Sequence, residues 1–251
     1  MKILAIHAHP DDVEFLCAGT LALLKQKGHA ISIATLSPGD KGTPDKSIFE
    51  MASIRRKEAQ RSADFLGASY TCLEFLDFEI FDDDRSRRRV TEFVRKINPD
   101  IVLTASPMDY MADHEAASVL TRHALFVAGI RNYHTGGAAP TNKIPALYYM
   151  DPMEGVDHFG QPVQPEFCVD ITSTIEFKEK MLASHASQRD WLLKHHGVDR
   201  YIEAMKEWSA IRGRLIGAAY AEGFRQHKGH AYPKENVLQE LLGPQIRLLA
   251  K

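Results

Sequence analysis

The chain has 251 residues, of which 44% are hydrophobic and 25% charged, and its net charge is -2. This balance is typical of a soluble globular protein and gives no support for a nucleic-acid partner held by bulk charge. The three cysteines (Cys17, Cys72 and Cys168) lie far apart and predict no disulfide framework. No apolar run approaches the roughly 18 residues of a membrane span, and the short run after Met1 is no signal-peptide core. We therefore expect a cytoplasmic protein without a membrane segment.

Strands and helices alternate four times in the first half of the chain. Apolar runs predict strands at residues 3–8, 30–36, 70–76 and 100–105, and amphipathic segments predict helices at 12–27, 50–66, 84–97 and 113–128. Asp84 is expected to be the N-cap of the third helix. Repeated βαβ units indicate a parallel sheet. The prediction is an α/β, Rossmann-like fold, with a mostly parallel sheet flanked by helices and a C-terminal extension.

The second half follows a different pattern. Residues 129–145 are rich in Gly, Pro, Asn and Thr and predict a loop that covers part of the molecule. Short strands are expected at 146–149 and 167–171, long helices at 174–195 and 199–221, and an irregular tail from His227 onward. No linker is apparent, so we predict a single domain, 1–251. Its Rossmann-like core with the metal site would be 1–128. Its extension, 129–251, is a candidate contact in a homo-oligomer.

Two loops carry a high density of metal-ligand residue types. In an open parallel sheet, ligands bind beyond the carboxyl ends of the strands, where residues 7–14 and 106–114 are expected to lie. His9 and Asp12 are three residues apart at a strand-to-helix turn and can converge on one point. His114 begins the helix after the fourth strand and can reach the same face. Two histidines and a carboxylate suit a divalent transition metal and leave positions open for water.

Neighbouring acids suggest supporting roles. Asp11 would point away from the ligands and is free to act as a base for a water. Glu14 and Asp113 could orient the ligand imidazoles. A simpler interpretation of the first loop is a turn whose Asp caps the next helix, but the second cluster favours a functional site. His7, on the same strand face as His9, is interpreted as a hydrogen-bonded core residue or as support for the site.

The two loops resemble known motifs. Residues 8–14 (Ala-His-Pro-Asp-Asp-Val-Glu) resemble the AHPDDxE motif of the PIG-L/LmbE family of zinc-dependent N-acetylglucosaminide deacetylases, and residues 107–114 resemble its PxDxHxDH motif. Weaker matches continue in order to about residue 225, at Gly39-Asp40, Arg55 with Glu58, Val169-Asp170-Ile171, Lys178, His185 with Ser187-Gln188, and Ala221-Glu222-Gly223-Phe224.

This resemblance implies an enzyme that removes the N-acetyl group from an N-acetylglucosamine-type sugar or its conjugate. It implies that His9, Asp12 and His114 bind Zn²⁺, although the ligand types also suit other divalent transition metals. Asp11 would be the general base. The implied substrate-binding residues are Arg55, Asp40 and Met111, and the implied supporting residues around the metal are Glu14, Asp109 and Asp113.

Met111 departs from the family pattern, because the second motif has a histidine at this position. That imidazole is thought to stabilise the oxyanion or to protonate the leaving amine, and a thioether is only a weak acceptor. Asp113 also loses its expected partner, which leaves it to cap the following helix. Either the metal alone polarises the carbonyl, or the chemistry is altered or lost, or another histidine fills the role. The candidate histidines are His134, His158, His195, His196, His227 and His230.

Two other functions therefore stay open. The chain could be a metal-containing binding or sensor protein without turnover. It could also be a hydrolase of another amide or ester, with Met111 shaping the pocket for an apolar group.

Overall fold

The computed structural model describes residues 1–42, 45–189 and 201–249. These residues contain an eight-stranded sheet with the order β3-β2-β1-β4-β5-β7-β6-β8. Strands β1 to β5 pair in parallel, whereas β5–β7, β7–β6 and β6–β8 pair antiparallel. The strands are β1 (Lys2–His7), β2 (Ala30–Thr35), β3 (Ser69–Cys72), β4 (Ile101–Thr104), β5 (Ala146–Met150), β6 (Phe167–Asp170), β7 (Ala221–Gln226) and β8 (Ile246–Leu248). The predicted α/β fold with a mostly parallel sheet is confirmed.

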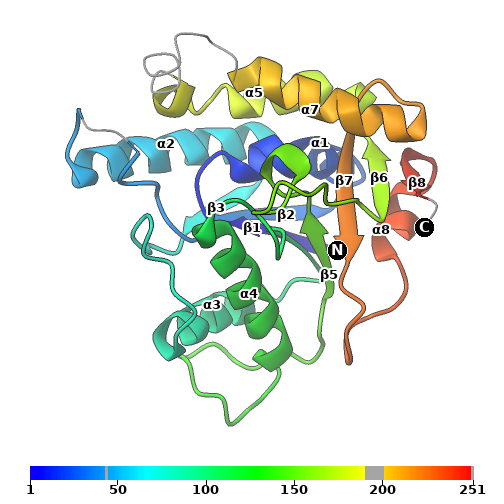
Figure 1. Ribbon diagram of the computed structural model, residues 1–251. Coiled ribbons are helices and arrows are strands. Elements are labelled where there is room, and N and C mark those ends of the chain that lie inside the picture. The colour runs from blue at the N-terminus through cyan, green and yellow to red at the C-terminus, as the bar shows by residue number, and fades with distance from the viewer. Residues whose placement is uncertain (43–44, 190–200, 250–251) are drawn as a thin grey trace.

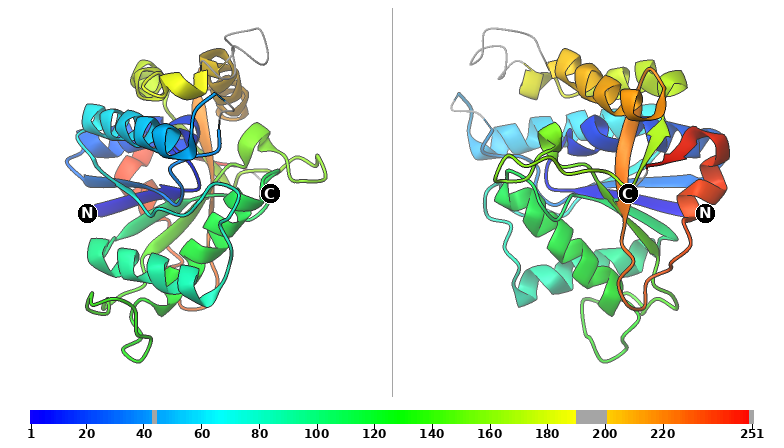
Figure 2. Two further views of the ribbon diagram at one scale, coloured as in Figure 1. Left: turned by 90° about the vertical axis from the view of Figure 1, so that its left-hand side faces the viewer. Right: turned by 45° about the vertical axis from the view of Figure 1, so that its right-hand side comes forward.

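Helices cover both faces of this sheet. Helices α1, α2, α5 and α7 lie over one face, and α3 and α4 lie over the other (Figure 1 and Figure 2). The side chains of β1 point alternately to the two faces of the sheet. Ile3 and Ala5 pack in one hydrophobic core, and Leu4 and Ile6 pack in the other. The helices are α1 (Asp12–Gln26), α2 (Ile48–Leu66), α3 (Asp84–Ile97), α4 (Ala112–Val127), α5 (Ile175–Leu182), α7 (Tyr201–Ile216) and α8 (Val237–Leu242).

Local capping sets the bounds of the first helices. Helix α2 begins with a capping box, in which Ser47 accepts from the Glu50 N–H and the Glu50 side chain bonds back to the Ser47 N–H. It ends at Gly67, whose φ of 66° is left-handed. Helix α3 is capped by Asp83, whose side chain accepts from the Ser86 N–H at 2.7 Å. The expected cap, Asp84, is therefore wrong by one residue.

The C-terminal half departs most from the prediction. The helix expected at 174–195 is interrupted after Leu182; residues 186–189 are helical again, and the part from residue 190 lies outside the described residues. The helix expected at 199–221 ends at Ile216, and Ala221–Gln226 is strand β7 in the sheet. The buried Glu222 explains this placement, since its carboxylate accepts from the Gly19 and Thr20 N–H groups and pairs with Lys178. Such long-range partners leave no local pattern in the sequence.

The loop at 129–145 does not cover the site that the sequence predicts. It packs against α3, where the Glu92 carboxylate accepts from the Thr135 hydroxyl at 2.7 Å and from the N–H groups of residues 136–138. These donors hold the pKa of Glu92 down, to about 2. One partly buried acceptor thus holds the middle of a loop that has little secondary structure of its own.

We expect Glu92→Gln to lower the melting temperature at pH 7 by about 2–4 °C, for a loss of about 1 kcal/mol in hydrogen bonds to a charged acceptor. The pKa of Glu92 is lower in the folded chain, so the stabilisation is complete above its usual pKa of 4.5 and is lost as pH falls toward about 2. Thermal melts of both proteins between pH 7 and pH 3 test this. A difference that stays constant down to pH 3 would contradict the assignment.

Among the described helices, none combines the length and the hydropathy that crossing a bilayer requires.

Candidate metal centre

The strand order places the two His/Asp loops side by side. Strand β1 lies between β2 and β4, so the chain leaves β1 toward one side of the sheet and returns on the other. Ligand sites form at such a switch point, beyond the carboxyl ends of the strands. A cavity of about 1030 Å³ opens here. It is lined by His9, Asp11, Asp12, Phe15, Lys41, Gly42, Arg55, Asp77, Phe78, Tyr110, Met111, His114, Met153, Glu154, Gln188, Tyr201, Ala204, Glu207, Trp208 and Ile211.

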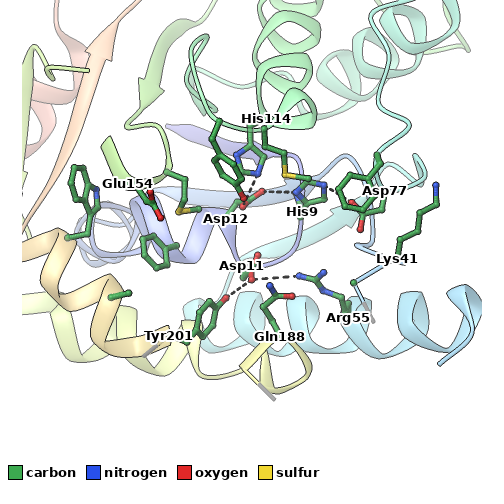
Figure 3. Close-up of a pocket in the computed structure, with 18 of the residues that line it drawn as sticks. His9, Asp11, Asp12, Lys41, Arg55, Asp77, His114, Glu154, Gln188 and Tyr201 are labelled. Atoms are coloured by element: carbon green, nitrogen blue, oxygen red, sulfur yellow. Dashed lines mark hydrogen bonds and ion pairs between the residues drawn. The ribbon is translucent and has the colours of Figure 1, made fainter. Parts of the chain in front are cut away.

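Asp12 is the centre of the histidine cluster (Figure 3). Its Oδ2 is 3.5 Å from His9 Nδ1, and its Oδ1 is 3.5 Å from His114 Nε2. His7 Nδ1 is closer, at 2.6 Å from Oδ2. Two donor groups of three residues each have their ligand atoms within 4.8 Å of one another: His7, Asp12 and His114, and His9, Asp77 and Asp113. Asp12 contacts histidines of both groups.

Exposure to the cavity separates these residues into two roles. A catalytic metal needs an open coordination position, so its ligands must face the cavity. His9, Asp12 and His114 line the cavity, whereas His7 is fully buried beneath it. The 2.6 Å contact of His7 is a hydrogen bond to Asp12. The two 3.5 Å separations are long for hydrogen bonds, so the His9 and His114 nitrogens that face Asp12 remain available to a metal. The donor set thus fits a divalent metal held by His9, Asp12 and His114.

Neighbouring carboxylates fix both candidate ligand imidazoles. His9 Nε2 lies 2.9 Å from Asp77 Oδ1 and 3.2 Å from Asp113 Oδ2. His114 Nδ1 lies 3.0 Å from Asp109 Oδ1. The other ring nitrogen of each imidazole, Nδ1 of His9 and Nε2 of His114, therefore faces Asp12. Such contacts set the tautomer and orientation of metal-binding histidines.

Two supporting residues act differently from the expectation. Asp113 does not cap α4; its Oδ2 instead accepts from the Phe78 N–H at 2.7 Å and faces His9. Glu14 was expected to orient a ligand imidazole. It instead accepts from the Ser62 hydroxyl at 2.6 Å and lies 3.1 Å from His185 Nε2, because the third residue of α1 points toward α2.

The electrostatics of the cluster favour a bound cation. Burial disfavours the charge of Asp12, but the facing His7 and His114 outweigh it and hold the pKa of Asp12 well below its usual value. Burial likewise lowers the pKa of His9, but hydrogen bonds to Asp113, Asp12 and Asp77 raise it well above its usual value. Buried carboxylates therefore outnumber the cationic side chains in this cluster. A bound divalent ion would offset this excess of negative charge.

Asp11 stands apart from the cluster, as the sequence predicts. Its backbone is left-handed, with φ at 95°, and its side chain does not cap α1. The carboxylate instead accepts from the Tyr201 hydroxyl at 2.5 Å and lies 3.7 Å from Arg55 Nη2 (Figure 3). Burial raises the pKa of Asp11, and Arg55 only partly opposes this. The interpretation of the Pro-Asp turn as a simple helix cap is thus wrong.

Arg55, on helix α2, connects two loops beside Asp11. Its guanidinium donates to the Pro10 carbonyl at 3.0 Å and to the Gly39 carbonyl at 3.3 Å. A side chain on residue 39 would place a Cβ 2.3 Å from Arg55 Nη1, and φ there is 69°, so glycine is required. Asp40 lies behind the cavity wall, where it accepts from the Asp77 N–H at 2.9 Å. This position gives no support for the expected contact between Asp40 and substrate.

Met111 lines the cavity, but four of the histidines proposed to replace the family's imidazole do not line it: His134, His158, His227 and His230. His158 lies 3.3 Å from Glu115, and His227 lies 3.0 Å from the Tyr149 hydroxyl. Among the described residues, the histidines that line the cavity are His9 and His114. His195 and His196 lie outside the described residues.

Sequence reasoning missed several cavity residues. Tyr201 and Trp208 were not singled out as site residues in the sequence, and they face the cavity from α7. Asp77 was likewise not singled out, although it contacts His9. The spacing of Tyr201 and Trp208, seven residues apart, indicates that they lie on the same face of a helix. Only the packing of α7 shows that this face borders the cavity.

Comparison with known proteins shows what the chain is similar to. Residues 4–125 match the family model described as PIG-L, GlcNAc-PI de-N-acetylase. The chain is similar to the diacetylchitobiose deacetylase of Thermococcus kodakarensis, with 29% identity over 94% of this chain and 88% of the relative. It is also similar to the 4-oxalmesaconate hydratase of Pseudomonas putida, with 28% identity over 88% and 87%.

The same resemblance appears in three dimensions. The crystal structure of the N,N'-diacetylchitobiose deacetylase of Pyrococcus horikoshii matches with a TM-score of 0.77 and 28% identity. The match covers 94% of this chain and 88% of that one. The family match, the relative and the solved structure therefore agree: the chain is a homologue of the PIG-L/LmbE family of deacetylases.

Proposed function

We propose that this chain is a metal-dependent hydrolase that removes the N-acetyl group from an N-acetylglucosamine-type sugar or its conjugate. The observation that carries the proposal is the juxtaposition, in one cavity, of a three-residue donor set with a separate carboxylate, Asp11. The named activity of the deacetylase relative supports the substrate class.

His9, Asp12 and His114 would hold the metal, with zinc as the first candidate. A divalent metal here supplies a Lewis acid that polarises the acetamide carbonyl and makes water more acidic. Asp11 accepts the proton of the attacking water. Its raised pKa makes it a stronger base than an exposed carboxylate, and the Tyr201 hydroxyl and Arg55 keep the carboxylate in place. Arg55 lies next to Asp11 in the cavity and would contact the substrate.

Tyr110 is our candidate for the donor that replaces the family's imidazole. Its ring contacts His114 edge-on, with the centroids 5.5 Å apart, and it lines the cavity beside Met111. The Tyr201 hydroxyl is committed to Asp11, whereas no partner among the described residues engages the hydroxyl of Tyr110. Partial burial and the carboxylates of Asp12 and Asp109 raise the pKa of Tyr110, so its hydroxyl stays protonated and can donate to an oxyanion.

The proposal is tested by acetate release from N-acetylglucosamine conjugates, with the metal content measured on the same sample. We expect one equivalent of metal per chain and release of one acetate per sugar. A protein that retains one equivalent of metal but releases no acetate from any conjugate would contradict the hydrolase proposal. That result would favour a metal-containing binding protein without turnover.

We expect Tyr110→Phe to lower kcat about a hundredfold, the usual loss when one oxyanion donor is removed, with unchanged metal content. Adding Met111→His to this variant should restore much of the loss, because an imidazole then returns at the family's position. Tyr220→Phe, outside the cavity, is the matched control. Steady-state kinetics on one conjugate measure all four proteins. Full activity of Tyr110→Phe would assign the donor elsewhere.

A further inference from the structure

One part of the cavity wall is apolar. It combines residues of α1 and α7 with the segments that follow β4 and β5, namely Phe15, Met111, Met153, Ala204, Trp208 and Ile211. The volume of about 1030 Å³ is at the upper limit of the roughly 300–1,000 Å³ that ligand pockets commonly have. The reacting acetamide and its sugar ring would not fill this part of the cavity, so another group of the substrate can occupy it.

Helix α7 connects this wall to the candidate base. Tyr201, Ala204, Trp208 and Ile211 are spaced by three, four and three residues, so they share one face of the helix. Tyr201 bonds Asp11, and Trp208 follows two turns later, about 10 Å along the axis. A sugar placed with its acetamide near Asp11 would therefore extend its substituent toward Trp208 and Ile211.

The indole of Trp208 is held in a fixed position. The Arg212 guanidinium lies over its ring, 4.4 Å from the centroid. Arg212 is itself buried, pairs with Asp151 at 2.6 Å and donates to the Val163 carbonyl at 3.1 Å. At Gly155, a Cβ would come within 1.9 Å of the indole, so only glycine allows this approach. An aromatic wall fixed in advance loses little entropy when a ligand binds.

We propose that Trp208, Ile211 and Phe15 form a subsite for an apolar aglycone, such as an alkyl or aryl group linked to the amino sugar. This inference rests on the proposed function and names its substrate class. The charge of the wall agrees: Arg212 is neutralised by Asp151, and Glu154 lines the cavity nearby (Figure 3). Among the described residues Glu154 forms no ion pair, so its carboxylate would repel an anionic aglycone, whereas an apolar one gains by leaving water.

The test is binding of the octyl and methyl glycosides of N-acetylglucosamine to the metal-loaded Asp11→Asn variant by calorimetry, below the micelle concentration of the octyl compound. We expect the octyl glycoside to bind at least tenfold more tightly, a difference of about 1.4 kcal/mol. Trp208→Ala in this background should remove that preference and leave the affinity for the methyl glycoside unchanged. Leu215→Ala, on α7 but outside the cavity, is the matched control and should keep it.

A second variant protects the test against misfolding. Trp208 contacts Arg212 and Gly155, so its removal can disturb the fold, whereas Ile211 is 38% exposed and Ile211→Ala should only weaken the octyl preference. Equal affinities for the two glycosides would overturn the proposal. An octyl preference that survives both Trp208→Ala and Ile211→Ala would also overturn it.

The subsite proposal and the hydrolase proposal can be contradicted independently of each other. The Asp11→Asn variant reports on the subsite without chemistry. If the wild-type protein releases no acetate but the octyl preference depends on Trp208, the subsite stands and the hydrolase proposal falls. If the wild-type protein releases acetate from both glycosides and Asp11→Asn binds them equally, the hydrolase proposal stands and the subsite falls.

Discussion

Asp11→Asn is expected to lower kcat by a factor of about 10²–10⁴, the range that a positioned general base contributes. The substitution keeps the shape of the side chain, and asparagine tolerates the left-handed backbone found at this residue. The amide cannot take the proton of the attacking water. Because Asp11 is not among the candidate ligands, the variant should retain one equivalent of metal.

Kinetics and metal analysis on the same preparation measure both parts of this result. Asp82→Asn is a suitable control, since Asp82 makes one surface ion pair with Arg87, and such pairs contribute little. A folded Asp11→Asn protein with wild-type kcat would remove Asp11 from the mechanism. Loss of the metal together with activity would make Asp11 a ligand and not a base.

His9→Ala and Asp12→Asn are expected to abolish metal binding, whereas His7→Gln should only weaken it. His9 and Asp12 face the cavity as candidate ligands, and His7 only supports Asp12 through the 2.6 Å hydrogen bond. Loss of a supporting contact usually costs 10–100-fold in metal affinity.

Metal binding should also stabilise the fold. A metal at a hundred times its Kd stabilises the fold by about 2.7 kcal/mol, so saturating zinc should raise the melting temperature of the wild-type protein by about 5–10 °C.

Thermal melts with and without zinc separate the two donor groups. We expect zinc to leave the melting temperatures of His9→Ala and Asp12→Asn unchanged. For His7→Gln we expect zinc to raise the melting temperature, but only at a higher zinc concentration than the wild-type protein needs. The reverse pattern, with binding kept in His9→Ala and lost in His7→Gln, would assign the metal to His7, Asp12 and His114. Both donor groups include buried histidines, so only the comparison of the two variants is decisive.

The sequence by itself was sufficient for the first half of the fold. Short apolar strands alternate with amphipathic helices, and the glycine at residue 67 has the left-handed backbone of a helix end. These are local signals, set by steric limits and by the period of side chains along a strand or helix. The same locality brings His9, Asp11 and Asp12 into one turn, because three residues at a strand-to-helix junction cannot separate.

Only the tertiary structure decided the rest, because the contacts involved join residues far apart in the chain. Strand β7 is held by Glu222 through donors about 200 residues away, and the loop at 129–145 follows Glu92 and not the site. Tyr201 reaches Asp11, and Asp77 and Asp113 reach His9, across different elements. Residue spacing cannot encode these pairs. They arise when burial of two apolar faces brings helices and strands together, and polar groups trapped there must find partners.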